Sequence, residues 1–294
     1  MGLTFNFRKT TTMKKYIFMA VAGMLALSSC SNDDNDIIAD NTPHAMTFTA
    51  SYGDGDAATR ATMNFSSDKK VSFDASDAIS ILSAKNANTQ FTTSEGGSSA
   101  AFTGTATDDS KFYAVYPYTS GLTLDGTTIK GIVIPTEQWN SVWAECLPTA
   151  EKWGWDPKAP IALAVADANS ALKFKNLCAI VKVNFEGECE CYAITISADQ
   201  NLAGTFDLDT TTGALTATSG SNSVTTPDND YDMDTMITSY GVRHVYLAIA
   251  PGTYTNFNLK IHHMTWGDFV NKTKSSATFE AGKIYDLGTF AIFN

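Results

Sequence analysis

The sequence has few basic residues for its length. Its 294 residues include 20 Lys and Arg against 31 Asp and Glu, which gives a formal net charge of −11 at pH 7. A surface of this sign repels the phosphates of nucleic acids and the headgroups of anionic lipids. The composition therefore argues against nucleic acid as a partner. The acids are spread along the chain, as is typical of a solvated surface.

The sequence also lacks the short motifs that commonly mark enzymes. It contains no HExxH, no GxSxG and no glycine-rich phosphate-binding loop. Histidine occurs at only four positions, His44, His244, His262 and His263. The last two are adjacent, so on a strand their side chains point to opposite faces and cannot easily share a metal ion. We therefore predict no enzyme, no catalytic residue, no metal site and no cofactor.

Long apolar runs are absent apart from one near the N-terminus. Tyr16–Leu27 follows two lysines and is too short to span a bilayer well. Small residues and a cysteine come next, in Leu27-Ser28-Ser29-Cys30. This pattern predicts a bacterial lipoprotein signal over residues 1–29, with Met13 as the true start and Cys30 as the lipidated residue. Several acyl chains on Cys30 would give stable anchoring. The alternative is a secretory signal cut elsewhere.

The cysteines after the signal leave their pairing open. An oxidising envelope permits disulfides, but the sequence alone cannot assign them. The four cysteines are Cys146, Cys178, Cys189 and Cys191. The last two lie two residues apart, a spacing that strains a direct disulfide, so separate partners or free thiols are favoured.

An acidic, turn-rich segment separates the signal from the rest of the chain. Residues 31–43 read SNDDNDIIADNTP, which predicts a flexible tether. The chain beyond it is long for a single core and fits two domains. We therefore predict a lipidated tether over residues 30–44, an N-terminal β-sandwich over 45–168 and a C-terminal β-sandwich over 169–294.

The remaining sequence has the pattern of an all-β protein. Short β-branched or aromatic runs are bounded by Gly, Asn, Asp, Ser or Pro. Helix signals are scarce, with Asn140–Leu147 as one short candidate. Strands that each bury one face favour sandwich packing. The predicted strands are Met46–Ala50, Val71–Ala75, Ala78–Leu82, Phe112–Tyr116, Ile132–Ile134, Ala171–Phe174, Ala179–Phe185, Ala193–Ser197, Gly204–Leu208, Val245–Ala250, Phe257–Ile261 and Ile284–Ile292.

The two halves of the chain also resemble each other. Each has an alternating strand, a Phe-containing strand, a short Thr-rich strand and a Tyr-containing strand that ends in Pro, beginning at Ala78 and at Ala193. This order supports two tandem sandwiches of similar topology.

Several segments, taken in order, carry a resemblance to a known family. They are Leu27–Cys30, Asn32–Asp36, Met46–Ala50, Ala57–Thr62, Asp77–Leu82, Phe112–Pro117, Leu172–Val183 and Phe279–Leu287. Over nearly the whole chain after Cys30, the sequence resembles the fimbrillin-like (Mfa-like, type V pilin) lipoproteins of Gram-negative anaerobes. It departs from them before Asp77, where Phe73-Asp-Ala-Ser76 replaces the usual Trp.

The resemblance implies a fold and a function. The fold would be two tandem transthyretin-like Greek-key β-sandwiches. The protein would be a fimbrial (pilus) subunit or adhesin, as an outer-membrane lipoprotein exposed on the cell surface or in fimbriae. Its partners would be other pilin subunits and a host or bacterial surface ligand, such as a glycan. The membrane would be contacted through the lipid anchor only.

The resemblance also implies a route of assembly. In polymerising members, an Arg-specific protease cuts the N-terminal segment and releases the first strand. The arginine that matches here is Arg60, and the released strand would be Met46–Ser51, with Met46 and Phe48 as its apolar residues. An open sheet edge with an apolar trough can then take a strand from a neighbouring subunit. The alternative for Arg60 is an ordinary exposed loop arginine.

The C-terminal end leaves the position within a fimbria open. Ile284–Phe293 is predicted to be the last strand, and the sequence stops at Asn294. A polymerising subunit needs a further donor segment or must lend this strand, in which case Ile284, Phe290 and Ile292 would be donor residues. Stalk, tip, anchor and non-polymerising roles all stay open.

A cluster of tryptophans supports an alternative function. Trp139, Trp143, Trp153 and Trp155 are four of the five tryptophans in the chain. If exposed, they could stack on sugar rings, which would make the protein a lipid-anchored glycan-binding protein. Large aromatic side chains more often pack in a core. A third possibility is a periplasm-facing structural lipoprotein.

Overall fold

The computed structural model is all-β in its described part. It describes residues 41–52, 62–63, 71–138, 152–154, 156, 158–168, 170–187, 191–226, 242–263 and 267–292. By its contacts the chain divides into two units, Met1–Ala39 and Asp40–Asn294, and every described residue belongs to the second. The all-β prediction is confirmed, and each predicted strand overlaps a strand of the structure. The predicted helix Asn140–Leu147 lies outside the described residues.

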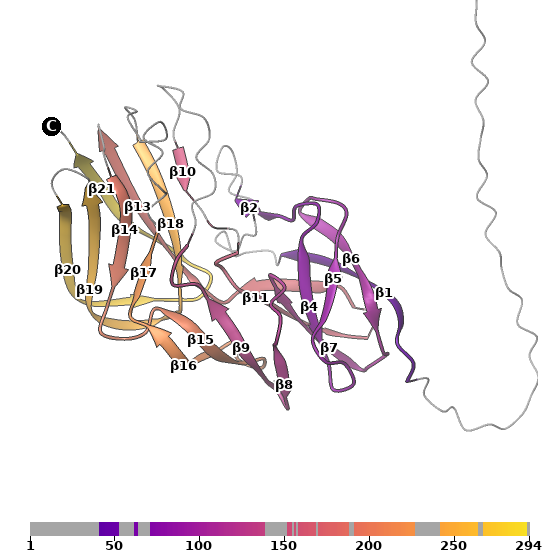
Figure 1. The fold of residues 1–294 in the computed structure, drawn as a ribbon. Coiled ribbons are helices and arrows are strands. Elements are labelled where there is room, and N and C mark those ends of the chain that lie inside the picture. The colour runs from indigo at the N-terminus through magenta and orange to yellow at the C-terminus, as the bar shows by residue number, and fades with distance from the viewer. Residues whose placement is uncertain are drawn as a thin grey trace, which may run out of the picture. The chain divides into compact units, whose positions relative to one another are not determined.

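Seven strands close into a barrel (Figure 1). Around the barrel the order is β1-β12-β11-β7-β4-β5-β6. Their bounds are β1 His44–Tyr52, β4 Ala78–Leu82, β5 Thr89–Thr92, β6 Ser99–Ala106, β7 Lys111–Tyr116, β11 Ala162–Asp167 and β12 Leu172–Asn176. A cluster of Phe, Tyr, Ile, Leu and Ala side chains fills the interior. Alternating residues such as Leu172 and Phe174 of β12 are fully buried while Lys173 and Lys175 are exposed, as expected of strands with one face inward.

Most of the remaining described strands form three four-stranded sheets. The first is β10 (Lys152–Gly154), β18 (Val242–Ile249), β13 (Ala179–Gly187) and β21 (Ile284–Ile292). The second is β17 (Ser223–Thr225), β14 (Cys191–Ser197), β19 (Gly252–His263) and β20 (Gly267–Phe279). The third is β16 (Leu215–Ser221), β15 (Ala203–Asp209), β9 (Thr128–Ile134) and β8 (Thr123–Asp125). A short pair joins β2 (Thr62–Met63) to β3 (Val71–Ser72).

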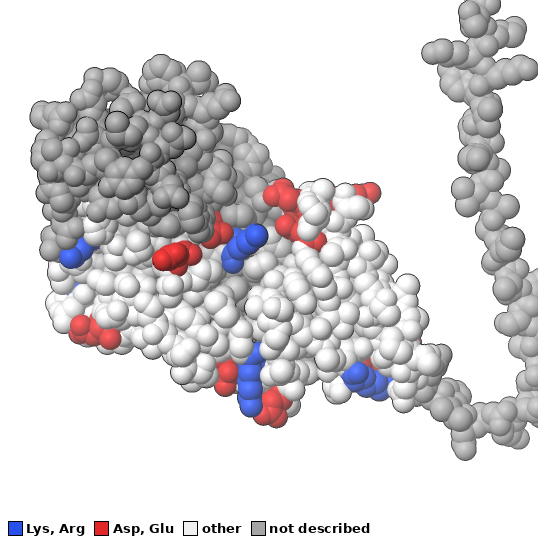
Figure 2. All heavy atoms as spheres, viewed as in Figure 1, with Lys and Arg blue, Asp and Glu red and all other residues white. Residues whose placement is uncertain are grey.

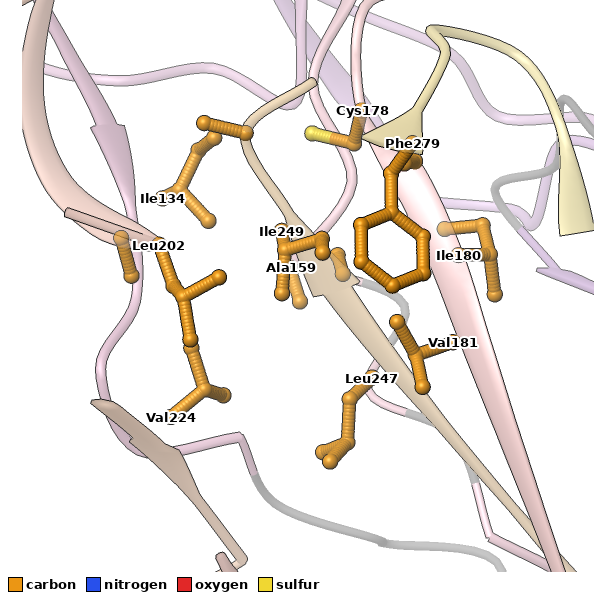
Figure 3. Packing of buried hydrophobic residues seen from close by; sticks show 14 of the residues in the cluster. Ile134, Ala159, Cys178, Ile180, Val181, Leu202, Val224, Leu247, Ile249 and Phe279 are labelled. Carbon is orange, nitrogen blue, oxygen red and sulfur yellow. The ribbon is translucent and has the colours of Figure 1, made fainter. Parts of the chain in front are cut away.

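One hydrophobic core joins these three sheets. Figure 3 shows Ile134 of β9, Val181 of β13 and Ile249 of β18 gathered with Phe279, and all four are buried. The apolar run of β7 explains how this core meets the barrel. Its even-numbered residues belong to the barrel cluster, whereas Tyr113 and Val115 belong to the larger core. A strand buried on both faces is expected to be continuously apolar.

The sheet pairing crosses the boundary that the sequence predicts at residue 169. The strand β12 begins after it, yet pairs in parallel with β1 and antiparallel with β11. The strand β9 comes before it, yet pairs with β15. The internal similarity is likewise not repeated in the pairing, because β4 pairs with β7 while their counterparts β14 and β18 lie in different sheets. The two tandem transthyretin-like domains stay a prediction.

Candidate strand-exchange site

The first strand, β1, is held by hydrogen bonds on both sides. Residues His44–Ser51 pair antiparallel with Ala106–Ser99 of β6. Residues Ala50–Tyr52 also pair in parallel with Leu172–Phe174 of β12. The strand therefore fills the gap between two neighbours that come from distant parts of the sequence. Without it, β6 and β12 would each present an unpaired edge.

The side chains of β1 complete the core of the barrel. Phe48 is 3% exposed, and its ring lies 5.5 Å from that of Phe91 and 5.1 Å from that of Phe112, measured between centroids. Ala50 is fully buried, and Met46 packs against the same cluster. Alternation of these residues with exposed Thr47 and Thr49 gives β1 one apolar face. Loss of the strand would thus leave an apolar trough as well as two open edges.

The C-terminal end of β1 is fixed by aromatic contacts. The ring of Tyr52 stacks on Phe73 at 5.1 Å and lies 5.9 Å from Phe174. Burial raises the pKa of the Tyr52 hydroxyl, as do the neighbouring Tyr116 and Asp77. Burial also raises the pKa of Asp77, which accepts a hydrogen bond from the Asp74 N–H at 2.9 Å. These contacts make the end of β1 a tightly packed aromatic region.

The last strand, β21, has a different environment. It lies at the edge of its sheet and pairs in parallel with β13 on one side. Asn184 donates a hydrogen bond to Asp286 at 2.7 Å, and Lys182 forms an ion pair with the same carboxylate at 3.1 Å. Phe290 is buried and Ile284 is half-buried. The backbone of Ile292 ends the strand. Side-chain bonds to β13 thus hold β21 in place.

The predicted residues fall into two groups. Met46, Phe48, Ile284, Phe290 and Ile292 lie on β1 and β21, which have no backbone pairing with each other. The others lie outside the described residues or have an undescribed side chain. The residues outside the described part of the chain are Cys30, Arg60, Trp139, Trp143 and Trp155. The residue whose side chain is not described is Trp153.

Cleavage at Arg60 stays a prediction, and described strands lie on both sides of this residue in the sequence. It comes after β1, which ends at Tyr52, and before β2, which begins at Thr62. A cut there would separate β1 from every later strand.

Trp153 lies on β10, where its backbone is paired with that of His244 on β18. The glycan-binding interpretation stays a prediction.

Cys178 is the cysteine that the structure describes most fully. It is a buried free thiol whose sulfur accepts a hydrogen bond from the Ile161 N–H at 3.3 Å. Burial raises the pKa of this thiol to about 12, and the hydrogen bond opposes the rise only in part. A thiol with such a high pKa is unreactive at neutral pH. Cys178 therefore acts as a core residue.

The flanking strands of β1 were not recognised as such in the sequence. The segment Leu172–Phe174 has a clear strand pattern, but nothing in it indicates a parallel partner more than a hundred residues earlier. Strand β6 has the alternation expected of a strand, with Ala100 and Phe102 buried and their neighbours exposed. Register across such distances depends on tertiary packing.

In the described residues, no helix is both long enough and apolar enough to cross a membrane.

Comparison with known proteins gives structural similarities only. No protein-family model matches the chain, and no curated protein sequence matches it. A solved protein from Bacteroides uniformis, proposed to act in cell adhesion, is 16% identical, with a TM-score of 0.48, and the match covers 84% of this chain and 93% of that one. A fimbrial assembly protein from Parabacteroides distasonis is 10% identical, with a TM-score of 0.40 and coverage of 83% and 90%.

A third solved structure is the tip fimbrial protein Mfa3 from Porphyromonas gingivalis with a C-terminal truncation. It is 8% identical, with a TM-score of 0.38, and the match covers 83% of this chain and 94% of that one. These structural neighbours are named as fimbrial proteins or as proteins proposed to act in cell adhesion, from Bacteroides, Parabacteroides and Porphyromonas. Similarity at this level assigns no function to the chain.

Proposed function

We propose that this protein is a subunit of a cell-surface fimbria, or a fimbrillin-like adhesin, that assembles by strand exchange. The observation that carries the proposal is the setting of β1. It is the first described strand, its apolar face fills the barrel beside Phe91 and Phe112, and it pairs with β6 and β12. A strand from another subunit with the same alternation could satisfy both edges and the trough after β1 leaves.

The proposed trigger is cleavage after Arg60. The chain has three arginines, Arg8, Arg60 and Arg243. Arg8 lies in the predicted signal, and Arg243 lies on β18, whose backbone pairs with β10 and β13. Backbone held in a sheet is a poor protease substrate, whereas cleavage requires an accessible extended segment. Arg243 is therefore expected to resist cleavage, which leaves Arg60 as the proposed site.

The test is to treat the mature protein, which lacks the predicted signal and therefore Arg8, with an Arg-specific protease. N-terminal sequencing should give Ala61, and gels run without heating should show SDS-resistant ladders. Arg60→Lys should abolish both, while Arg243→Lys should change neither. Cleavage at Arg60 that leaves only monomers would contradict assembly by strand exchange. Ladders that form equally well with Arg60→Lys would contradict the proposed trigger.

We further propose that Cys30 carries the lipid anchor and that the protein reaches the outer surface. Radiolabelled palmitate should enter the protein in cells and should fail to enter Cys30→Ala. External protease should degrade the wild-type protein on intact cells. Palmitate labelling of protein that stays protected until the cells are broken would favour the periplasm-facing alternative.

A further inference from the structure

The edge strands β20 and β21 border an apolar groove. The two strands follow each other in the chain but belong to different sheets, and each is the last strand of its sheet (Figure 1). The groove has a volume of about 400 Å³. Its lining is mainly apolar and aromatic, with Phe257, Leu259, Ala277, Phe279, Leu287 and Phe290. A cavity of this size is typical of a binding site.

Two lysines of β20 point into this groove. Lys274 lies opposite Phe257 of β19, and Lys272 lies opposite Leu259. Directly opposed residues of an antiparallel pair point to the same face of a sheet. Since Phe257 and Leu259 are buried in the core, both lysines lie on the inner face of β20. The ammonium of Lys272 lies 4.5 Å from the centre of the Phe290 ring, across the groove on β21.

The lysines make the mouth of the groove positive. Among the described residues, no carboxylate forms an ion pair with either of them. Asp286, which also lines the groove, is already paired with Lys182. On the face shown in Figure 2, the charged side chains lie in small separate groups on a mostly uncharged surface. Lys272 and Lys274 thus form a local pair of basic groups on an acidic protein.

We propose that the groove between β20 and β21 binds an extended acidic peptide from a partner protein. Its apolar side chains would contact the end of the groove near Phe279. Two carboxylates two residues apart would pair with Lys272 and Lys274, which have the same spacing along a strand. The edge backbone of β20 would add hydrogen bonds, as in β-strand addition. We expect the peptide to run antiparallel to β20, because antiparallel pairing is the more stable. In this direction its apolar residues would come before its carboxylates in the peptide sequence.

In the described part of the chain the outer edge of β20 has no strand partner, which favours a peptide over a small amphiphile. A fatty acid could satisfy the apolar lining and one lysine, but not the backbone groups that β20 presents beyond its pairing with β19. The inference does not depend on strand exchange at β1, because β20 and β21 share no backbone pairing with the barrel.

The experiment measures binding of a fluorescent peptide, Ile-Thr-Ile-Thr-Asp-Thr-Asp, to the full-length protein by anisotropy. The control peptide carries Asn in place of both Asp residues. We expect the control to bind at least tenfold more weakly. Lys272→Thr/Lys274→Thr should weaken binding of the acidic peptide by a similar factor. The matched control, Lys173→Thr/Lys175→Thr, removes two exposed lysines with the same spacing on β12 and should leave binding unchanged.

Hydrogen exchange locates the bound peptide, and amides of β20 should gain protection when it binds. Equal binding of the Asn peptide, or equal losses in both double variants, would overturn the proposal. Binding of sodium dodecanoate without binding of the peptide would identify a lipid-like ligand instead. The proposal would also be overturned if the peptide does not bind and Lys272→Thr/Lys274→Thr self-associates in sedimentation. That result would show that the lysines only protect an exposed strand edge from pairing with another chain.

Discussion

The rings of Phe48 and Phe112 meet edge to face, with centroids 5.1 Å apart and an interplanar angle of 64°. The contact joins β1, near the start of the described chain, to β7 in the barrel wall. Aromatic pairs in this geometry add to the stability gained by burial alone. The barrel therefore depends on a strand that the proposed cleavage would remove.

Phe48→Ala should destabilise the intact protein strongly. The change leaves a cavity between Phe91 and Phe112, and such Phe to Ala changes cost about 3–5 kcal/mol. Urea unfolding followed by tryptophan fluorescence checks this. Thr49→Ala, on the exposed face of the same strand, should stay within about 0.5 kcal/mol of wild type. A small effect of Phe48→Ala would mean that β1 contributes little to the barrel.

Gly104→Ala should also destabilise the barrel, for a different reason. A Cβ at this position would lie 2.6 Å from the Phe91 ring, so the ring or the backbone must shift. Overpacking of this kind costs about 1–3 kcal/mol. Thermal unfolding of Gly104→Ala should show a lowered midpoint, while Thr105→Ala, an exposed neighbour, should not. An unchanged midpoint for Gly104→Ala would indicate that Phe91 has room to move.

Asp286 should make stability depend on pH in the acid range. Burial opposes ionisation of its carboxylate, but hydrogen bonds from Gly288, Lys182 and Asn184 outweigh it and lower the pKa. A pKa lowered by folding gives stability that is present above the unfolded value, about 4, and is lost as pH falls through the folded value.

The test for Asp286 compares wild type with Asp286→Asn. The wild-type protein should be the more stable at pH 6, and the difference should shrink as the pH falls from about 4 toward 2. Urea unfolding at a series of pH values measures it. Asp167→Asn, which removes the charge of an exposed side chain on β11, controls for general effects of lost charge. A difference that stays constant with pH would show that the Asp286 ion pair does not control it.

Cys178 should resist alkylation in the folded protein. Its thiol is buried and its pKa is raised to about 12, so the reactive thiolate is scarce at pH 8. Iodoacetamide labelling followed by peptide mapping should find Cys178 unmodified in buffer and modified in 6 M guanidinium chloride. Rapid labelling in buffer would mean that the core around Cys178 opens readily.

Much of the strand content could be predicted from the sequence, because burial of one face imposes a period of two. This is why Met46–Ala50, Ala78–Leu82 and Ala193–Ser197 were recognised. The strand β20 was missed, because its residues 272–276 are all exposed and polar. A strand whose inner face borders an open groove has no buried alternation to detect.

The sequence by itself determined the all-β class, the acidic surface and most strand positions, since these depend on composition and local periodicity. Only the tertiary structure decided that β1 lies between β6 and β12, and that Lys272 and Lys274 face an apolar groove. Both facts depend on which strands pair and in which register. Pairing across long stretches of chain is selected by the packing of the whole core, and no local pattern encodes it.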